Sequence, residues 1–316
     1  MRLSIILVNW NNSDDTQACL QSLAVAQALS QEMDVQIVVV DNHSDPAERA
    51  RLAMIEDTLD KATTTFLHRP GNGGLAAGYN TGIRYCLEHF HPDAIWLLNN
   101  DTRVDAQCLA VWQAALSAHP HIRIWGSTIY TMNTPPALFC TGGFRYHAAL
   151  SIPFPLREQS KVSREDLYQR LPGMDYVSGI SMCVKADCFV RHGLLDESYF
   201  LYYEELELVK QCGGRDAIAW CPASIVYHKG GGSTGSHDPN RGMGSPMAHY
   251  YGNRSALVYT RRHHPWFLPL VVVLRLIAKS ALFVRYGEWS GFKPLLLAYR
   301  DFFLGRPARS PDSIRS

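Results

Sequence analysis

Residues 94–102 read AIWLLNNDT, a short apolar run followed at once by polar residues. The first five are all apolar, which is typical of a parallel strand covered on both faces. Asn99, Asn100 and Asp101 then stand at its carboxyl end, where open α/β sheets bind ligands. A carboxylate flanked by amides can hold Mg²⁺ or Mn²⁺, because hard cations prefer oxygen ligands. A strand that ends in an ordinary polar turn is the alternative interpretation of this stretch.

Three earlier segments end in the same way. Residues 3–8, 35–40 and 63–67 are predicted strands, and helices are expected from Ser13 or Asp14 and over residues 75–89. This alternation predicts an α/β fold with a doubly wound, mostly parallel sheet flanked by helices. The polar groups that follow these strands are Asn9-Trp10-Asn11, Asp41-Asn42 and His68-Arg69. In a parallel sheet they converge on one edge, so a nucleotide site is the favoured interpretation.

The pattern changes after Asp101. Helices are expected over residues 106–119, 186–192 and 202–212, short strands over 217–220 and 225–227, and a mobile linker over 230–244. Residues 122–160 are rich in turn signals, and the last 70 residues are predicted to be helical. We therefore expect a nucleotide-sugar-binding half (1–105), an acceptor-binding and catalytic half of the same domain (106–245) and a helical extension (246–316).

Composition narrows the class of protein. The 316 residues are 47% apolar and 19% charged, which indicates a globular chain. A net charge of +1 gives no field that recruits nucleic acid, so no nucleic-acid partner is expected. Eight cysteines without a CxxC pair predict reduced, mostly buried thiols of a cytosolic protein. No signal peptide is expected, and no apolar stretch reaches the roughly 18 residues of a membrane span. The nearest, residues 266–274, is interrupted by Arg275 and Lys279.

Residues 71–78, GNGGLAAG, contain a G-x-G-x-x-A match. A dinucleotide-binding loop follows the first strand, whereas this one follows the third, which argues against a dehydrogenase. We expect its glycines to let backbone approach a ligand and to open the helix that carries Tyr79 and Asn80. A simple tight turn into a helix is the alternative.

Several motifs together resemble the inverting family 2 glycosyltransferases of GT-A fold. They are, in order, VNWNN, VVVDNHSD, RPGNGGLAAGYNTG, WLLNNDT, GLLDESYFLYYEELEL and VYHKGGGST. The later segment HYYGNRSALVYTRRHHP is most similar to the bacterial rhamnosyltransferases of surface-polysaccharide assembly. The resemblance covers roughly residues 3–265 and implies a nucleotide-diphosphate sugar as donor, with Mg²⁺ or Mn²⁺ as cofactor.

The resemblance also implies roles for individual residues. Asp41 would bond the base, Asn9 would line its pocket, and the donor would lie along Asn72, Gly73, Asn80 and Asn100. Asp101 would bind the cation, with His228 as second ligand or phosphate contact. Glu205 stands at the position of the family's catalytic base. The implied acceptor-binding residues are Asp196, Glu197, Tyr202 and Glu204.

This sequence departs from the family pattern in two places. Glu205 and Glu207 replace two aspartates, and the metal motif is Asn-Asn-Asp, which leaves one carboxylate. A solvated acidic helix start is the structural alternative for residues 204–207. The departures keep open a non-catalytic nucleotide-sugar-binding protein derived from a transferase. A nucleotidyltransferase is a further alternative, although residues 9–12 lack the glycine- and lysine-rich loop it needs.

The last third of the sequence contains features that indicate a possible membrane partner. A basic cluster precedes Trp266 and an apolar run; its members are Arg254, Arg261, Arg262, His263 and His264. One interpretation is a pair of helices that touch an anionic membrane; the other is a pair that packs on the catalytic domain. The best prediction is a cytoplasmic enzyme, peripheral at the inner face of the bacterial membrane. It would move L-rhamnose from dTDP-rhamnose to a lipid-linked or oligosaccharide acceptor.

Overall fold

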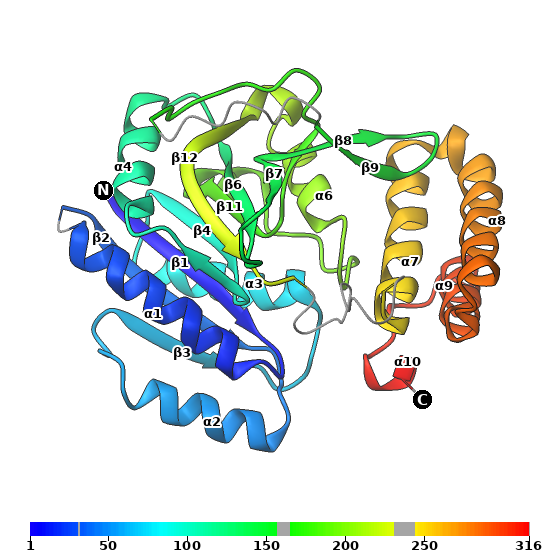
Figure 1. Ribbon diagram of the computed structural model, residues 1–316, viewed down its shortest axis with the longest axis horizontal. Coiled ribbons are helices and arrows are strands. Elements are labelled where there is room, and N and C mark those ends of the chain that lie inside the picture. Colours follow the sequence, from blue (N-terminus) through cyan, green and yellow to red (C-terminus); the bar gives the residue numbers. More distant parts are fainter. Residues whose placement is uncertain (31, 157–164, 231–243, 316) are drawn as a thin grey trace.

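The structure is a computed structural model that describes residues 1–30, 32–156, 165–230 and 244–315. Its amino-terminal half alternates strands and helices as predicted (Figure 1). The elements are β1 (Arg2–Asn9), α1 (Ser13–Leu29), β2 (Asp34–Asp41), α2 (Pro46–Glu56), β3 (Thr64–His68), α3 (Leu75–His89) and β4 (Ala94–Asn99). The four strands are parallel and lie in the order β3-β2-β1-β4. Their carboxyl ends therefore share one edge of the sheet.

The second half makes the sheet mixed. Its elements are β5 (Thr102–Val104), α4 (Cys108–Ala118), β6 (Ile124–Thr131), β7 (Leu138–Thr141), β8 (Gly143–His147), β9 (Ile152–Pro155), β10 (Tyr176–Val177), β11 (Ser181–Lys185), α5 (Ala186–His192), α6 (Glu204–Gln211) and β12 (Ile218–His228). Strand β11 lies antiparallel between β4 and β6, so only the first half is purely parallel. The two short strands expected near residues 217–227 are one strand, β12, with a register shift between Cys221 and Ile225.

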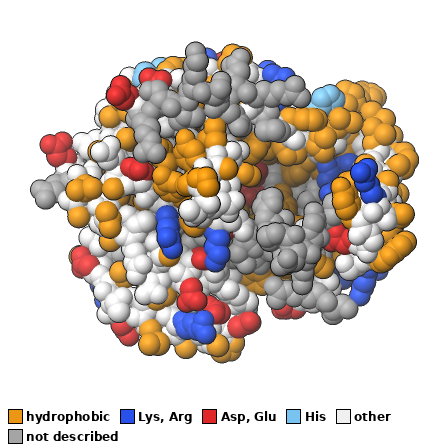
Figure 2. Space-filling view, in the orientation of Figure 1, with side chains coloured by type: hydrophobic (Ala, Val, Ile, Leu, Met, Phe, Trp, Pro, Cys, Tyr) orange, Lys and Arg blue, Asp and Glu red, His pale blue; other side chains and the backbone are white. Residues whose placement is uncertain are grey.

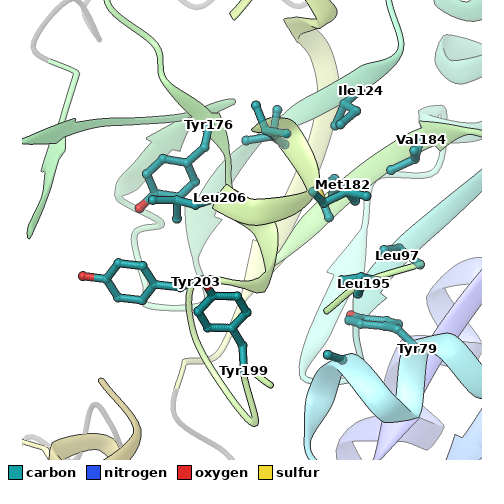
Figure 3. Close-up of a cluster of buried hydrophobic side chains, with 14 of the residues drawn as sticks. Tyr79, Leu97, Ile124, Tyr176, Met182, Val184, Leu195, Tyr199, Tyr203 and Leu206 are labelled. Carbon is teal, nitrogen blue, oxygen red and sulfur yellow. The ribbon is translucent and has the colours of Figure 1, made fainter. Parts of the chain in front are cut away.

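The sheet has a core on each face, because strand residues alternate between the two sides. In β1, Ile5 and Leu7 pack with α1 and α4, whereas Ile6 and Val8 pack with α3 and α6. Figure 3 shows part of the second core, where Leu206 lies beside Tyr176. All eight cysteines are buried free thiols, as expected.

Helices form the carboxyl-terminal region, as predicted: α7 (Pro246–His263), α8 (Leu268–Tyr286), α9 (Phe292–Phe303) and α10 (Asp312–Arg315). They stand side by side at one end of the molecule, with α8 outermost (Figure 1). The 22-residue stretch Pro265–Tyr286 is long and apolar enough to cross a membrane, with a mean hydropathy of 2.2. The expectation that no stretch has this length and composition is therefore corrected. The predicted linker 230–244 lies almost entirely outside the described residues.

Candidate functional site

A cavity of about 320 Å³ lies at the carboxyl ends of β1, β2 and β4. Asn72, Asn100 and Asp101 line it from the amino-terminal half. Residues of β12, α6 and α7 complete the wall, among them His228, Glu205 and Tyr251. The convergence expected from the strand ends is thus present for β1, β2 and β4, and the cavity includes both Asp101 and Glu205. His68 and Arg69, at the end of β3, do not line it, so that part of the prediction is wrong.

Asp101 and His228 form a pair at the edge of this cavity. Strand β5, which follows Asp101, pairs antiparallel with the end of β12, so Thr102 lies opposite His228. The Nε2 atom of His228 lies 3.2 Å from Oδ1 of Asp101. The backbone NH of Lys229 donates to the Asp101 carbonyl at 3.0 Å, which fixes the strand end against β12.

This pair supplies a carboxylate oxygen and an imidazole nitrogen, both ligands suited to Mn²⁺, and the carboxylate also suits Mg²⁺. Among the described residues no group of three or more His, Cys, Asp or Glu side chains is arranged to hold a metal. The residues therefore fit a cation that takes its remaining ligands from a bound diphosphate and water. They do not form a closed protein cage.

Glu204 and Glu205 begin α6 and both line the cavity. Within the described part of the chain, Oε2 of each carboxylate is buried without a hydrogen-bond partner. Burial raises the pKa of Glu205 to about 7, although backbone NH groups of Glu205 and Tyr203 act against the shift. Burial and the neighbouring Glu205 charge raise the pKa of Glu204 well above its usual range. A solvated acidic helix start is therefore excluded, and a carboxylate with a pKa of about 7 can take up a proton near neutral pH.

Glu207 points elsewhere, although it belongs to the same acidic run. Its Oε2 accepts from the Tyr199 hydroxyl at 2.9 Å and lies 2.7 Å from His263 Nε2 and 3.2 Å from Arg262 Nη1. It is 4% exposed and does not line the cavity. Glu207 therefore ties α6 to α7, and its role is structural.

The backbone before α6 is held in an uncommon conformation. Tyr202 and Tyr203 both have positive φ angles, 66° and 75°. This explains why the helix begins at Glu204 and not at Tyr202 as predicted. The Tyr203 hydroxyl donates to the Ser151 carbonyl at 2.6 Å, and Arg275 of α8 donates to the same oxygen at 2.6 Å. A buried hydrogen-bond network thus fixes the segment that presents Glu205.

The glycine loop before α3 packs against this same segment. Gly74 has a φ of 89°, and a Cβ atom there would lie 2.2 Å from the Phe200 carbonyl oxygen. The NH of Leu75 donates to that oxygen at 2.8 Å. At Gly74 the close backbone approach is therefore to the chain itself, and not to a ligand as predicted. The loop still lines the cavity through Asn72, Gly74 and Leu75.

Two predicted donor-binding residues lie behind the wall. Asn9 is fully buried and its amide donates to Asp41 at 3.2 Å and to Ser44 at 3.1 Å. Asp41 is 1% exposed and accepts from the backbone NH of Ser44. Neither lines the cavity. In this structure they orient the loop after β2 and do not face the open space.

Other predicted positions also stay out of the cavity. The Asn80 amide donates to the Leu195 carbonyl and to Glu197, each at 2.8 Å, and so joins α3 to the segment before α6. Asp196 pairs with Arg262. Gly73 lies against Arg69. Of the predicted acceptor residues, Tyr202 and Glu204 line the cavity, whereas Asp196 and Glu197 do not.

Sequence reasoning missed several lining residues. Trp10 lines the cavity beside the end of β1, and Tyr251 of α7 stacks on Phe200 with ring centroids 4.5 Å apart. The Asn42 amide donates to Asn72 at 3.0 Å. Trp10 and Asn42 had a signal, since each directly follows the last residue of a strand. The rings come from segments whose meeting depends on the tertiary fold.

Comparison with known proteins agrees with this geometry. Residues 4–137 match the model of glycosyl transferase family 2, which agrees with the resemblance of the motifs in that part of the chain. A solved structure, the mannosyltransferase PcManGT from Pyrobaculum calidifontis in complex with GDP-Man and Mn²⁺, is 12% identical with a TM-score of 0.54. That match covers 96% of this chain and 87% of the other, and at this identity it shows the fold alone, which is of GT-A type.

Two curated relatives are more similar in sequence. The low-salt glycan biosynthesis hexosyltransferase Agl10 of Haloferax volcanii is 26% identical over 236 residues, which cover 68% of this chain and 66% of the relative. The N-acetylglucosaminyl-diphospho-decaprenol L-rhamnosyltransferase of Mycobacterium tuberculosis is 27% identical over 201 residues, 62% of each chain. The matched region is thus slightly under two thirds of each relative's length.

Proposed function

We propose that this protein is an inverting glycosyltransferase that moves a sugar from a nucleotide-diphosphate donor to an acceptor hydroxyl. The observation that carries the proposal is the shared cavity, which Asp101 and Glu205 line from opposite halves of the domain. The family 2 match and the relatives' hexosyl- and rhamnosyltransferase names support it. L-Rhamnose from dTDP-rhamnose is the donor we propose.

In this reaction Glu205 takes the proton from the acceptor hydroxyl as that oxygen attacks the anomeric carbon. A bond forms between the acceptor oxygen and the anomeric carbon, and the bond to the diphosphate oxygen breaks. The departing nucleoside diphosphate keeps the electron pair, and the proton stays on the Glu205 carboxylate. In-line displacement inverts the anomeric configuration. Glu204, whose pKa is raised by burial and by the neighbouring Glu205 charge, lines the same cavity and would hydrogen-bond the acceptor sugar.

We propose that Asp101 and His228 hold Mg²⁺ or Mn²⁺. When bound, the cation would offset the negative charge that grows on the departing diphosphate. Asn72 and Asn100 lie on the same side of the cavity as Asp101 and would orient the donor. Asn9, Asp41 and Asn80 would support that wall from behind.

The acceptor we propose is lipid-linked or an oligosaccharide, in surface-polysaccharide synthesis at the inner face of a bacterial cytoplasmic membrane. A relative named for a diphospho-decaprenol acceptor supports this. The test is to incubate the protein with a panel of nucleotide sugars, with and without Mn²⁺, and to measure nucleoside diphosphate release. We expect release from one or a few donors and faster release with an acceptor. Tight donor binding without any turnover would instead support the non-catalytic alternative.

A further inference from the structure

Helix α8 presents an apolar stripe to the outside of the molecule. The exposed residues are spaced three or four apart, as on one face of a helix. They are Leu270, Val273, Leu274, Ile277, Ala278, Ala281 and Val284, which we call the outer stripe. Figure 2 shows hydrophobic side chains along the edge where α8 lies in Figure 1. Only 11% of the apolar window in Pro265–Tyr286 is buried in the molecule.

The charges of this helix point the other way. Arg275 donates to the carbonyls of Ser151 at 2.6 Å and Gly252 at 3.2 Å, and to the Asn253 side chain. Lys279 is partly buried, and burial lowers its pKa. These two share the inner face with Val271 and Phe283, which are fully buried. A surface helix in water normally hides its apolar face, so the polarity of α8 is inverted.

The ends of the helix carry the groups that prefer a membrane interface. Trp266, at the start, is 94% exposed, and Tyr286 and Trp289, at the other end, are 60% and 66% exposed. Aromatic rings of this kind concentrate at the level of lipid headgroups. Residues 261–300 contain seven Lys or Arg and one acid, Glu288. That carboxylate lies 3.4 Å from His249 and its side chain is 14% exposed. Arg275 and Lys279 lie on the inner face and Arg262 pairs with Asp196, but Arg261 and Arg285 are exposed near the two ends of the helix. The exposed charge at the ends of the stripe is therefore positive and complements anionic headgroups.

We propose that the outer stripe, with Trp266 and Trp289, binds the surface of a membrane that contains anionic lipids, with α8 lying in the plane of the bilayer. A spanning orientation is disfavoured because the inner face is hydrogen-bonded to Ser151 and α7. A second copy is disfavoured because a symmetric contact would bring the same positive charges together. The occupant that satisfies both the apolar stripe and its basic ends is a lipid surface.

This inference deepens the proposed function and rests on it only for the acceptor. Met247 and Tyr251 of α7 line the cavity, and α7 also packs against α8. The helical layer that binds lipid would thus border the cavity in which a lipid-linked hydroxyl must meet Glu205. Membrane binding itself needs neither donor nor acceptor.

The first test is flotation of the full chain with vesicles of phosphatidylcholine, with or without phosphatidylglycerol. We expect binding that phosphatidylglycerol strengthens and salt weakens. Val273→Asp/Ile277→Asp should weaken it by about tenfold or more. The matched control Met54→Asp/Val190→Asp changes two apolar residues elsewhere that are even more exposed, 71% and 73% against 51% for Val273 and 61% for Ile277, and should bind as wild type. Absence of wild-type binding, or equal loss in the control, would overturn the proposal.

The second test locates the bound surface. Brominated acyl chains quench nearby tryptophans, and five of the seven are either fully buried or in the cavity. Wild-type fluorescence should be quenched, and Trp266→Phe/Trp289→Phe should lose most of that quenching. If the variant were quenched as strongly as wild type, the outer stripe would not be the membrane-binding surface. The proposal would also be rejected if the protein formed a dimer without lipid and Val273→Asp/Ile277→Asp converted that dimer to a monomer. Donor turnover in solution is measured separately, so failure of the proposed reaction can be told apart from failure of membrane binding.

Discussion

His228 Nε2 lies 3.2 Å from Asp101 Oδ1, because β12 returns antiparallel beside the short strand that follows Asp101. Replacing Asp101 with Asn should weaken Mn²⁺ binding in the presence of nucleoside diphosphate by about tenfold or more, since outer-sphere changes alone cost that much. His228→Ala should act in the same direction. Titration calorimetry with Mn²⁺ and nucleotide measures this without turnover. Unchanged affinity in both variants would exclude this pair as ligands.

Glu205→Gln should lower kcat by about 10²–10⁴-fold, because the amide cannot accept the acceptor's proton. The donor dissociation constant should stay within about twofold, since the carboxylate is assigned to the acceptor side. Glu205→Asp, which restores the residue type of the family motif, should retain measurable transfer. Steady-state kinetics and donor titrations give both quantities. A Glu205→Gln enzyme that turns over like wild type would reject the base.

The pH profile follows from the same carboxylate. Because burial raises the pKa of Glu205 to about 7, the base is protonated and inactive below neutrality. The value of kcat/KM should therefore rise with pH and level off above about 7. Burial is the largest cause of this shift and Glu204 is not among its causes, so Glu204→Gln should hardly move the midpoint. If kcat/KM did not change between pH 4.5, the ordinary pKa of glutamate, and pH 8, Glu205 would not be the titrating base.

The glycine loop gives a prediction about stability. Gly74→Ala should lower Tm by about 3 °C or more, because its φ of 89° costs an alanine about 1 kcal/mol before any clash. The new methyl would also collide with the Phe200 carbonyl. Gly71→Ala is the matched control, since no atom lies within 4 Å of its Cβ position. Calorimetry should give a lower Tm for Gly74→Ala than for Gly71→Ala. Equal Tm values would mean that the Phe200 contact does not affect stability.

Much of this architecture could be predicted because its signals are local. The strands that end at Asn9, Asp41 and Asn99 each finish in four or more consecutive apolar residues before that polar residue, and parallel packing alone brings their ends together. That Glu205 and Asp101 share a site could be predicted only from the resemblance of the motifs. The burial of Glu205 could not be predicted, because it depends on contacts between distant parts of the chain, such as that of Tyr203 with Ser151.

The predictions that differ from the structure also failed because they depend on contacts between distant parts of the chain. Asn9 and Asp41 were predicted to contact the donor. They lie outside the cavity and are hydrogen-bonded to Ser44, a contact that single-strand patterns do not contain. In α8, Arg275 and Lys279 interrupt an apolar run along the chain. In space they turn toward α7 and the β8–β9 turn, and the exposed face stays apolar.

The most direct test of the central claim is a crystal structure with the nucleotide-diphosphate sugar and Mn²⁺ bound, with the metal located by its anomalous scattering. We expect Mn²⁺ in contact with an Asp101 oxygen and the diphosphate, and the anomeric carbon between the diphosphate and the Glu205 carboxylate. A diphosphate bound away from Asp101, or Glu205 on the leaving-group side of the sugar, would contradict it.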